Sequence, residues 1–198
     1  MHPRALDATE VLDRLALQQL AHAYCHAVDR GDLVLLRSLY HDDAIDDHGE
    51  MFRGSPDEYV AWLPNMLAGL AATRHEITGM LFIVDGDRAQ GELVNTAYHR
   101  TLGPEAREII VSGRYLDTYA KREGVWRILR RSLVMDAFED RPAQSAGGFI
   151  GKGVPWGSAG LDDPVYTLDL FAEARAGGAA GAAKAAGAAR SAETGEKV

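Results

Sequence analysis

The apolar residues near the start of the chain are spaced as on one face of a long helix over residues 8–30. Asp7, followed three residues later by Glu10, provides a helix start, and Gly31 provides a stop. A second, short helix is predicted over residues 33–40, with Asp32 as its N-cap. The apolar positions assigned to the first helix are Leu12, Leu15, Leu20, Tyr24, Ala27 and Val28.

A third helix is predicted to begin at Ser55-Pro56-Asp57-Glu58, because this segment combines a capping box with proline at the first helical position. We expect Pro64 to kink or divide the helix before it continues to Ala72. Between the second and third helices, residues 41–53 are polar and rich in turn formers, which favours a short hairpin.

From residue 75 onward the pattern changes to the alternation that is typical of strands. Long strands are predicted over residues 90–102, 108–121 and 125–136, and the turn Arg122-Glu123-Gly124 joins the last two. Strands joined by short turns pair antiparallel, and helices followed by a sheet indicate the α+β class.

Composition divides the chain into three predicted parts. Residues 1–140 form the α+β domain. Residues 141–174 carry Pro, Gly and scattered aromatic residues, which predicts an arm packed on the domain or on a neighbouring subunit. Residues 175–198 are rich in Ala and Gly and contain a single large apolar residue, Val198, so disorder or weak helix is expected there.

The charge of the chain argues against some classes of partner. The 198 residues carry a formal net charge of -8, whereas nucleic-acid binding needs clustered Lys and Arg. The single cysteine, Cys25, rules out an intrachain disulfide. No stretch approaches the roughly 20 apolar residues that cross a bilayer, and the first residues lack an apolar signal core. We therefore expect a cytoplasmic protein that binds neither nucleic acid nor membrane.

Two residues stand out as a possible acid–base pair. Asp29 lies at the end of the first predicted helix, and His75 lies where the strand pattern begins. A carboxylate bonded to one imidazole nitrogen fixes the tautomer and raises the basicity of the other nitrogen. Each residue also has a structural alternative, as an exposed helix-end carboxylate or a strand-edge histidine. The aspartates between His41 and His48 are adjacent rather than spaced to converge, so no metal site is predicted.

The order of predicted elements resembles the SnoaL-like branch of the nuclear transport factor 2 superfamily over about residues 8–138. This resemblance implies a cone-shaped α+β barrel, in which N-terminal helices pack on a strongly curved antiparallel sheet and enclose a cavity. The scaffold hosts many chemistries, so the resemblance specifies the fold better than the reaction. The segments that carry it are Tyr24-x-x-x-x-Asp29-x-Gly31-Asp32, Leu39-Tyr40-His41-Asp42-Asp43-Ala44, Gly113-Arg114-Tyr115-x-Asp117 and Arg122-Glu123-Gly124-Val125-Trp126-Arg127-Ile128.

Within that superfamily the pattern is most similar to the cofactor-free lyases, of which scytalone dehydratase, bile-acid 7α-dehydratase and hexachlorocyclohexane dehydrochlorinase are examples. The resemblance implies that Asp29 orients His75 as the base, that Tyr24 donates to a substrate oxygen and that Arg130 stabilises developing negative charge. It also implies a homotrimer that needs no cofactor and no metal. Tyr24 has an alternative role as a core aromatic residue, and Arg130 as a surface or interface charge.

Strand alternation predicts which side chains share the cavity face of the sheet. A wall of mixed apolar and polar groups suits a small hydrophobic or aromatic ligand, and Gly113 is expected to leave room for a flat ring. His99 also has an alternative, structural or solvent-facing, role. The predicted substrate contacts are His99, Tyr115, Asn95, Gly113, Val111, Ser132, Val134 and His48.

These features together predict a cofactor-independent lyase of aromatic compound catabolism. It would remove water from a small hydrophobic aromatic or polycyclic alcohol, or formaldehyde from a hydroxymethyl-bearing, lignin-derived diaryl compound. One alternative is a polyketide or steroid isomerase or cyclase, in which Asp117 or Asp136 would matter more than His75. Another is a non-catalytic ligand-binding module, which would tolerate the loss of His75. The apolar outer face of the sheet, with Ile110 and Leu116, predicts oligomers.

Overall fold

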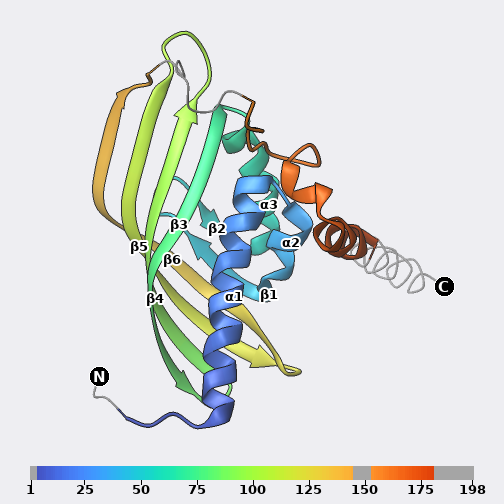
Figure 1. Cartoon of the computed structure of the whole chain (residues 1–198). Coiled ribbons are helices and arrows are strands. Elements are labelled where there is room, and N and C mark those ends of the chain that lie inside the picture. The colour runs from blue at the N-terminus through green and yellow to red at the C-terminus, as the bar shows by residue number, and fades with distance from the viewer. Residues whose placement is uncertain (1–3, 145–152, 181–198) are drawn as a thin grey trace, which may run out of the picture.

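The computed structural model describes residues 4–144 and 153–180 (Figure 1). Three helices and a short hairpin precede four long strands. The helices are α1 (Ala8–Arg30), α2 (Leu33–Ser38), α3 (Pro56–Leu67) and the 3-10 helix η1 (Pro164–Thr167). The strands are β1 (Tyr40–Asp47), β2 (Arg53–Gly54), β3 (Leu70–Asp85), β4 (Arg88–Thr101), β5 (Arg107–Arg122) and β6 (Val125–Pro142).

All six strands form one sheet in the order β2-β1-β6-β5-β4-β3. β1 runs parallel to β6 and the other neighbours pair antiparallel, so the sheet is mixed rather than purely antiparallel as predicted. The four long strands curve past α1, which contacts β3 and β6 (Figure 1). The predicted α+β class is confirmed. The sheet remains open, with β2 and β3 as its edges, and does not close into a barrel.

The helix starts confirm the capping signals. Asp7 accepts a hydrogen bond from the Glu10 backbone, and Ser55 and Glu58 form a reciprocal capping box. The predicted continuation of the third helix to Ala72 is wrong, because α3 ends at Leu67 and the chain enters β3 at Leu70. Pairing with β4 outweighs local helix propensity over these residues.

The core lies between α1 and the inner face of the sheet. Leu17, Tyr24 and Val28 are almost completely buried on one face of α1. Leu12 and Leu15, which we predicted on that face, are instead 66% and 55% exposed. The buried stripe is rotated away from them, because the side chains that meet the sheet follow the 17-21-24-28 spacing. Among the described residues, no helix combines the length and apolar character that a bilayer crossing demands.

The C-terminal segment packs beside the end of α1. Arg30 forms an ion pair of 2.5 Å with Asp163, and its carbonyl accepts a 2.7 Å hydrogen bond from Gly160. Further along, Arg175 lies 3.8 Å from Asp32. Residues 169–180 are helical, whereas the rest of the predicted Ala/Gly-rich tail lies outside the described residues. The three-part division of the chain stays a prediction.

Candidate active site

The structure brings Asp29 and His75 together. Asp29 is the penultimate residue of α1, and His75 lies on β3, a strand that α1 packs against. His75 Nδ1 lies 2.7 Å from Asp29 Oδ1, and the His75 backbone N–H donates to Oδ2 at 2.8 Å. The two side chains are 9% and 8% exposed. Because the carboxylate accepts from Nδ1, the proton sits there and Nε2 carries the lone pair of a base.

A second histidine adjoins this pair. The His99 ring meets that of His75 edge-on, with centroids 5.4 Å apart, and its Nδ1 lies 3.0 Å from Thr73 Oγ1. Burial, and to a smaller extent the neighbouring His75, lowers the pKa of His99 to about 4. His99 is therefore neutral at physiological pH. It lines the site beside His75 as a polar group and does not act as an acid.

The lowered pKa of His99 predicts acid sensitivity. An unfolded histidine has a pKa of about 6.5. Between pH 6.5 and 4, therefore, the unfolded chain binds a proton at this residue and the folded chain does not. Stability from this group is present above pH 6.5 and is lost as the pH falls toward 4. The free energy of unfolding, measured with urea at pH 7.5 and 4.5, should be lower at pH 4.5. We expect His99→Gln to reduce this difference by up to about 3 kcal/mol. An unchanged pH dependence would contradict this assignment.

Tyr24 lies on α1 five residues before Asp29 and is 1% exposed. Its hydroxyl is 2.8 Å from that of Tyr59 on α3, and its ring meets Tyr115 edge-on at 5.7 Å. Burial raises the pKa of all three phenols well above 10. They are therefore neutral groups, which can donate a hydrogen bond but do not act as phenolates.

The cavity-facing placement predicted for Arg130, Ser132 and Val134 is wrong. The register of β5 and β6 shifts between Thr118 and Tyr119, which inserts one extra residue into β6. Beyond this β-bulge the alternation of side chains is reversed. Arg130 is consequently 46% exposed, next to Asp47 on β1. Ser132 and Val134 pair with residues on the outer face of β5, Leu116 and Arg114.

Arg131 takes the inner position instead. It is 1% exposed and binds Asp117 through Nε at 2.9 Å and Nη2 at 2.6 Å. Its guanidinium lies 3.9 Å from the centroid of the Tyr24 ring and 4.1 Å from that of Tyr115. Nη1 is buried without a hydrogen-bond partner in the described structure. The alternation rule missed this residue, because no residue type in β6 marks the bulge.

Gly113 has a different function from the predicted one. A Cβ at this position would lie 2.3 Å from the Val134 carbonyl oxygen. Glycine is therefore required by the close approach of the β6 backbone, where the register shifts a second time, rather than by a flat ligand. On the neighbouring strands, Asn95 is 2% exposed with its Oδ1 unpartnered, and Val111 is half-buried beside Ala97.

His48 belongs to a second imidazole–carboxylate pair. Its Nδ1 lies 2.6 Å from Asp46 Oδ1, although the two atoms lack the alignment of a hydrogen bond. The Tyr40 hydroxyl donates to the other oxygen of Asp46 at 2.5 Å. The His48 ring stacks on Tyr59 at 5.5 Å and meets Tyr115 edge-on at 6.3 Å. These contacts join His48 to the tyrosine cluster next to Tyr24.

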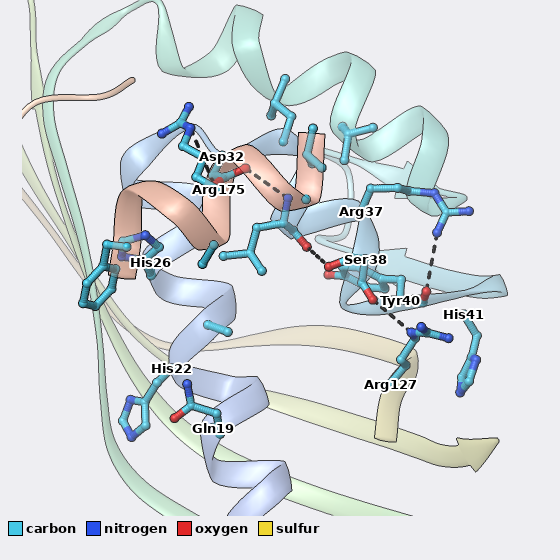
Figure 2. Close-up of a pocket in the computed structure, with 18 of the residues that line it drawn as sticks. Gln19, His22, His26, Asp32, Arg37, Ser38, Tyr40, His41, Arg127 and Arg175 are labelled. Atoms are coloured by element: carbon cyan, nitrogen blue, oxygen red, sulfur yellow. Dashed lines mark hydrogen bonds and ion pairs between the residues drawn. The ribbon is translucent and has the colours of Figure 1, made fainter. Parts of the chain in front are cut away.

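A groove of about 1310 Å³ lies elsewhere, along a different stripe of α1. Figure 2 shows His22 and His26 of α1 on one side of it and Arg127 on the other. Several of its polar groups bind the backbone, as Arg127 does with the Ser38 carbonyl. None of the predicted site residues lines it. The described residues also contain no group of three His, Cys, Asp or Glu side chains that could hold a metal.

Comparisons with known proteins agree on the scaffold. A curated relative, the uncharacterized protein Rv2910c of Mycobacterium tuberculosis, is 26% identical over 128 residues, which are 64% of this chain and 87% of the relative. Among solved structures, a hexachlorocyclohexane dehydrochlorinase (LinA Type2) superposes with a TM-score of 0.64 at 20% identity, covering 70% of this chain and 95% of the other. A candidate scytalone dehydratase from Novosphingobium aromaticivorans gives 0.62 at 22% identity, covering 71% and 95%.

At these identities the structural matches establish the fold alone. The family model is more specific, since that of the SnoaL-like domain matches residues 9–132, which include Asp29, His75 and Arg131. This match spans more than half of the chain. The chain therefore belongs to the SnoaL-like domain family.

Proposed function

We propose that this protein is a cofactor-independent lyase that acts on a small hydrophobic molecule, with His75 as the general base. The contact that carries the proposal is the bond of 2.7 Å between Asp29 and His75 Nδ1. The second carboxylate oxygen holds the His75 backbone, so both the ring and the strand are fixed. A base held in this way typically contributes about 10² to 10⁴-fold to a rate.

The reaction begins at a C–H bond next to an activating carbonyl or aromatic group. His75 Nε2 takes the proton, the electron pair forms a double bond, and the leaving group departs from the adjacent carbon. Arg131 supports the developing charge in the role that the resemblance gave to Arg130, because its buried Nη1 lacks a partner that a substrate oxygen can provide. Tyr24, neutral and next to Arg131, supplies a phenol donor.

The named structural neighbours support an elimination. One is described as a dehydrochlorinase and another as a candidate dehydratase. Both names denote the removal of a small molecule, hydrogen chloride or water. We accordingly place dehydration of an aromatic or polycyclic alcohol first and loss of formaldehyde from a hydroxymethyl-bearing diaryl compound second. The homotrimer and the cytoplasmic location remain predictions.

The isomerase or cyclase alternative is less well supported. Asp117 is bound by Arg131 and by the Tyr119 hydroxyl, so neither of its oxygens is free to act as a base. Asp136 is half-exposed and pairs with Arg114. His75, by contrast, has a nitrogen without a hydrogen bond in the described structure.

A substrate panel tests this function. We expect the wild-type protein to turn over at least one β-hydroxy aryl ketone, secondary aromatic alcohol or lignin-derived hydroxymethyl diaryl compound. His75→Ala should lower that rate by about 10² to 10⁴-fold while the circular dichroism spectrum is retained. The measurement is product formation by liquid chromatography. Equal rates in both proteins would contradict the proposal.

A further inference from the structure

The Asp46–His48 pair is left without a role by the base chemistry at His75. We propose that His48 is the general acid of this site, which protonates the departing oxygen while His75 removes the proton from carbon. This inference rests on the proposed lyase function. It assigns the two halves of the elimination to two imidazoles, each placed beside a buried carboxylate.

The position of His48 suits this role. Its side chain is 9% exposed, its backbone N–H donates to the Phe52 carbonyl at 2.7 Å, and its ring stacks on Tyr59. Tyr59 in turn shares a 2.8 Å hydroxyl contact with Tyr24, which lies five residues before Asp29 on α1. In the described structure His48 Nε2 makes no hydrogen bond, so it is available to a ligand on the inner face.

The buried carboxylate of Asp46 lies beside His48. Asp46, with an exposed fraction of 0%, lies on β1 directly beside Arg131 of β6. Asp117 already neutralises Arg131 through two hydrogen bonds. The surrounding phenols are neutral, because burial raises the pKa of Tyr24, Tyr40 and Tyr59 well above 10. Asp46 is therefore a buried carboxylate with the His48 imidazole 2.6 Å away, and buried charges are stable only when they are paired.

The two imidazole–carboxylate pairs differ in how their carboxylates are hydrogen-bonded. Asp29 receives two aligned donors, the Nδ1 and the backbone N–H of His75, and is satisfied with His75 neutral. Asp46 receives the Tyr40 hydroxyl on one oxygen and has on the other only the close contact of 2.6 Å with His48 Nδ1. One imidazole is therefore held by a directed hydrogen bond and the other by a close contact with a carboxylate oxygen.

The proposed elimination accounts for every proton and electron pair. His75 Nε2 gains the proton from carbon, whose bonding electrons form the double bond. The adjacent C–O bond breaks, and its electron pair stays with the oxygen. His48 gives its Nε2 proton to that oxygen, so water leaves rather than hydroxide. Solvent then returns both imidazoles to their starting states, with no net change in protons.

Two probes with different leaving groups test the role of His48. They are 3-hydroxy-1-phenylpropan-1-one, which must lose hydroxide or water, and its O-acetyl ester, which loses acetate without needing a proton. We expect His48→Gln to slow loss of water by about 10² to 10⁴-fold and loss of acetate by less than about tenfold. Exchange of the proton next to the carbonyl with D2O, followed by NMR, should stay within about threefold of wild type. Asp46→Asn should repeat this pattern more weakly.

The matched control is His41→Gln on β1, the strand that ends directly before His48. His41 Nε2 binds the Ala120 carbonyl at 2.9 Å, and glutamine can replace that donor, so both leaving groups should be released at the wild-type rate. Equal slowing of the two probes by His48→Gln, or unchanged loss of water, would overturn the acid role while leaving the base in place. Loss of D2O exchange would overturn it too, because His48 would then act in proton removal. A wild-type protein that neither exchanges nor eliminates any compound of the panel would refute the lyase function and the acid role together.

Discussion

Asp29→Asn is expected to lower turnover by about 10⁴-fold, as loss of an orienting carboxylate does in hydrolases. The carboxylate accepts two hydrogen bonds, from the His75 backbone N–H and from Nδ1. Asparagine has only one acceptor. If its oxygen keeps the backbone bond, its NH2 faces Nδ1, which must then lose its hydrogen. The proton moves to Nε2, and the nitrogen that should act as the base is occupied.

Asp32→Asn is the control for this substitution. It removes the same charge three residues away, but asparagine is as good an N-cap as aspartate and can still accept from the Leu35 backbone N–H, now 3.0 Å from Oδ1. We expect this variant to retain near wild-type turnover. Initial rates on an active compound and 15N shifts of the His75 imidazole measure the two effects. An Asp29→Asn protein with the Nε2–H tautomer and full activity would contradict His75 as the base.

The helices were predictable because their signals are local. The caps of α1 and α3 depend on residues three positions apart, Asp7 with Glu10 and Ser55 with Glu58, and the chain alone specifies them. The end of α3 was not predictable in the same way. Residues after Leu67 join β3 because β4 is there to pair with them, and that partner is about 30 residues away in sequence.

The inner face of the sheet shows where alternation fails. Asn95 and Tyr115 lie on the side predicted for them, because the pairing of β4 with β5 runs without a shift. In β6 a single extra residue turns Arg131 rather than Arg130 toward the inner face of the sheet. Nothing in the sequence of the strand distinguishes these two neighbours. Long-range pairs such as Arg131 with Asp117 are therefore visible only once the register is known.

The juxtaposition of Asp29 and His75 was predicted through the resemblance to SnoaL-like proteins rather than through spacing. They are 46 positions apart, and the residues between them carry no periodic signal that links a helix end to a strand. The packing of α1 against β3 supplies that link in the structure. The catalytic role of the pair stays a prediction.

Arg131→Met is expected to destabilise the fold by about 3–5 kcal/mol. The substitution removes a fully buried cation and leaves Asp117, with an exposed fraction of 3%, as an unpaired buried charge. It also removes the cation that lies against the faces of Tyr24 and Tyr115. Domains of this size are stable by only about 5–15 kcal/mol. Urea unfolding followed by tryptophan fluorescence should therefore show a large loss of stability.

The neighbouring Arg130→Met is the matched control, because it differs by one position and lies on the opposite face of the same strand. Arg130 is half-exposed, with contacts of 3.5 Å to Asp47 and 3.4 Å to the Ser132 hydroxyl, and exposed pairs of this kind contribute less than about 1 kcal/mol. Similar losses from the two variants would mean that the β-bulge is misplaced. Adding Asp117→Asn to Arg131→Met should recover part of the lost stability. The reason is that this loss arises from the unpaired Asp117 carboxylate as well as from the missing guanidinium.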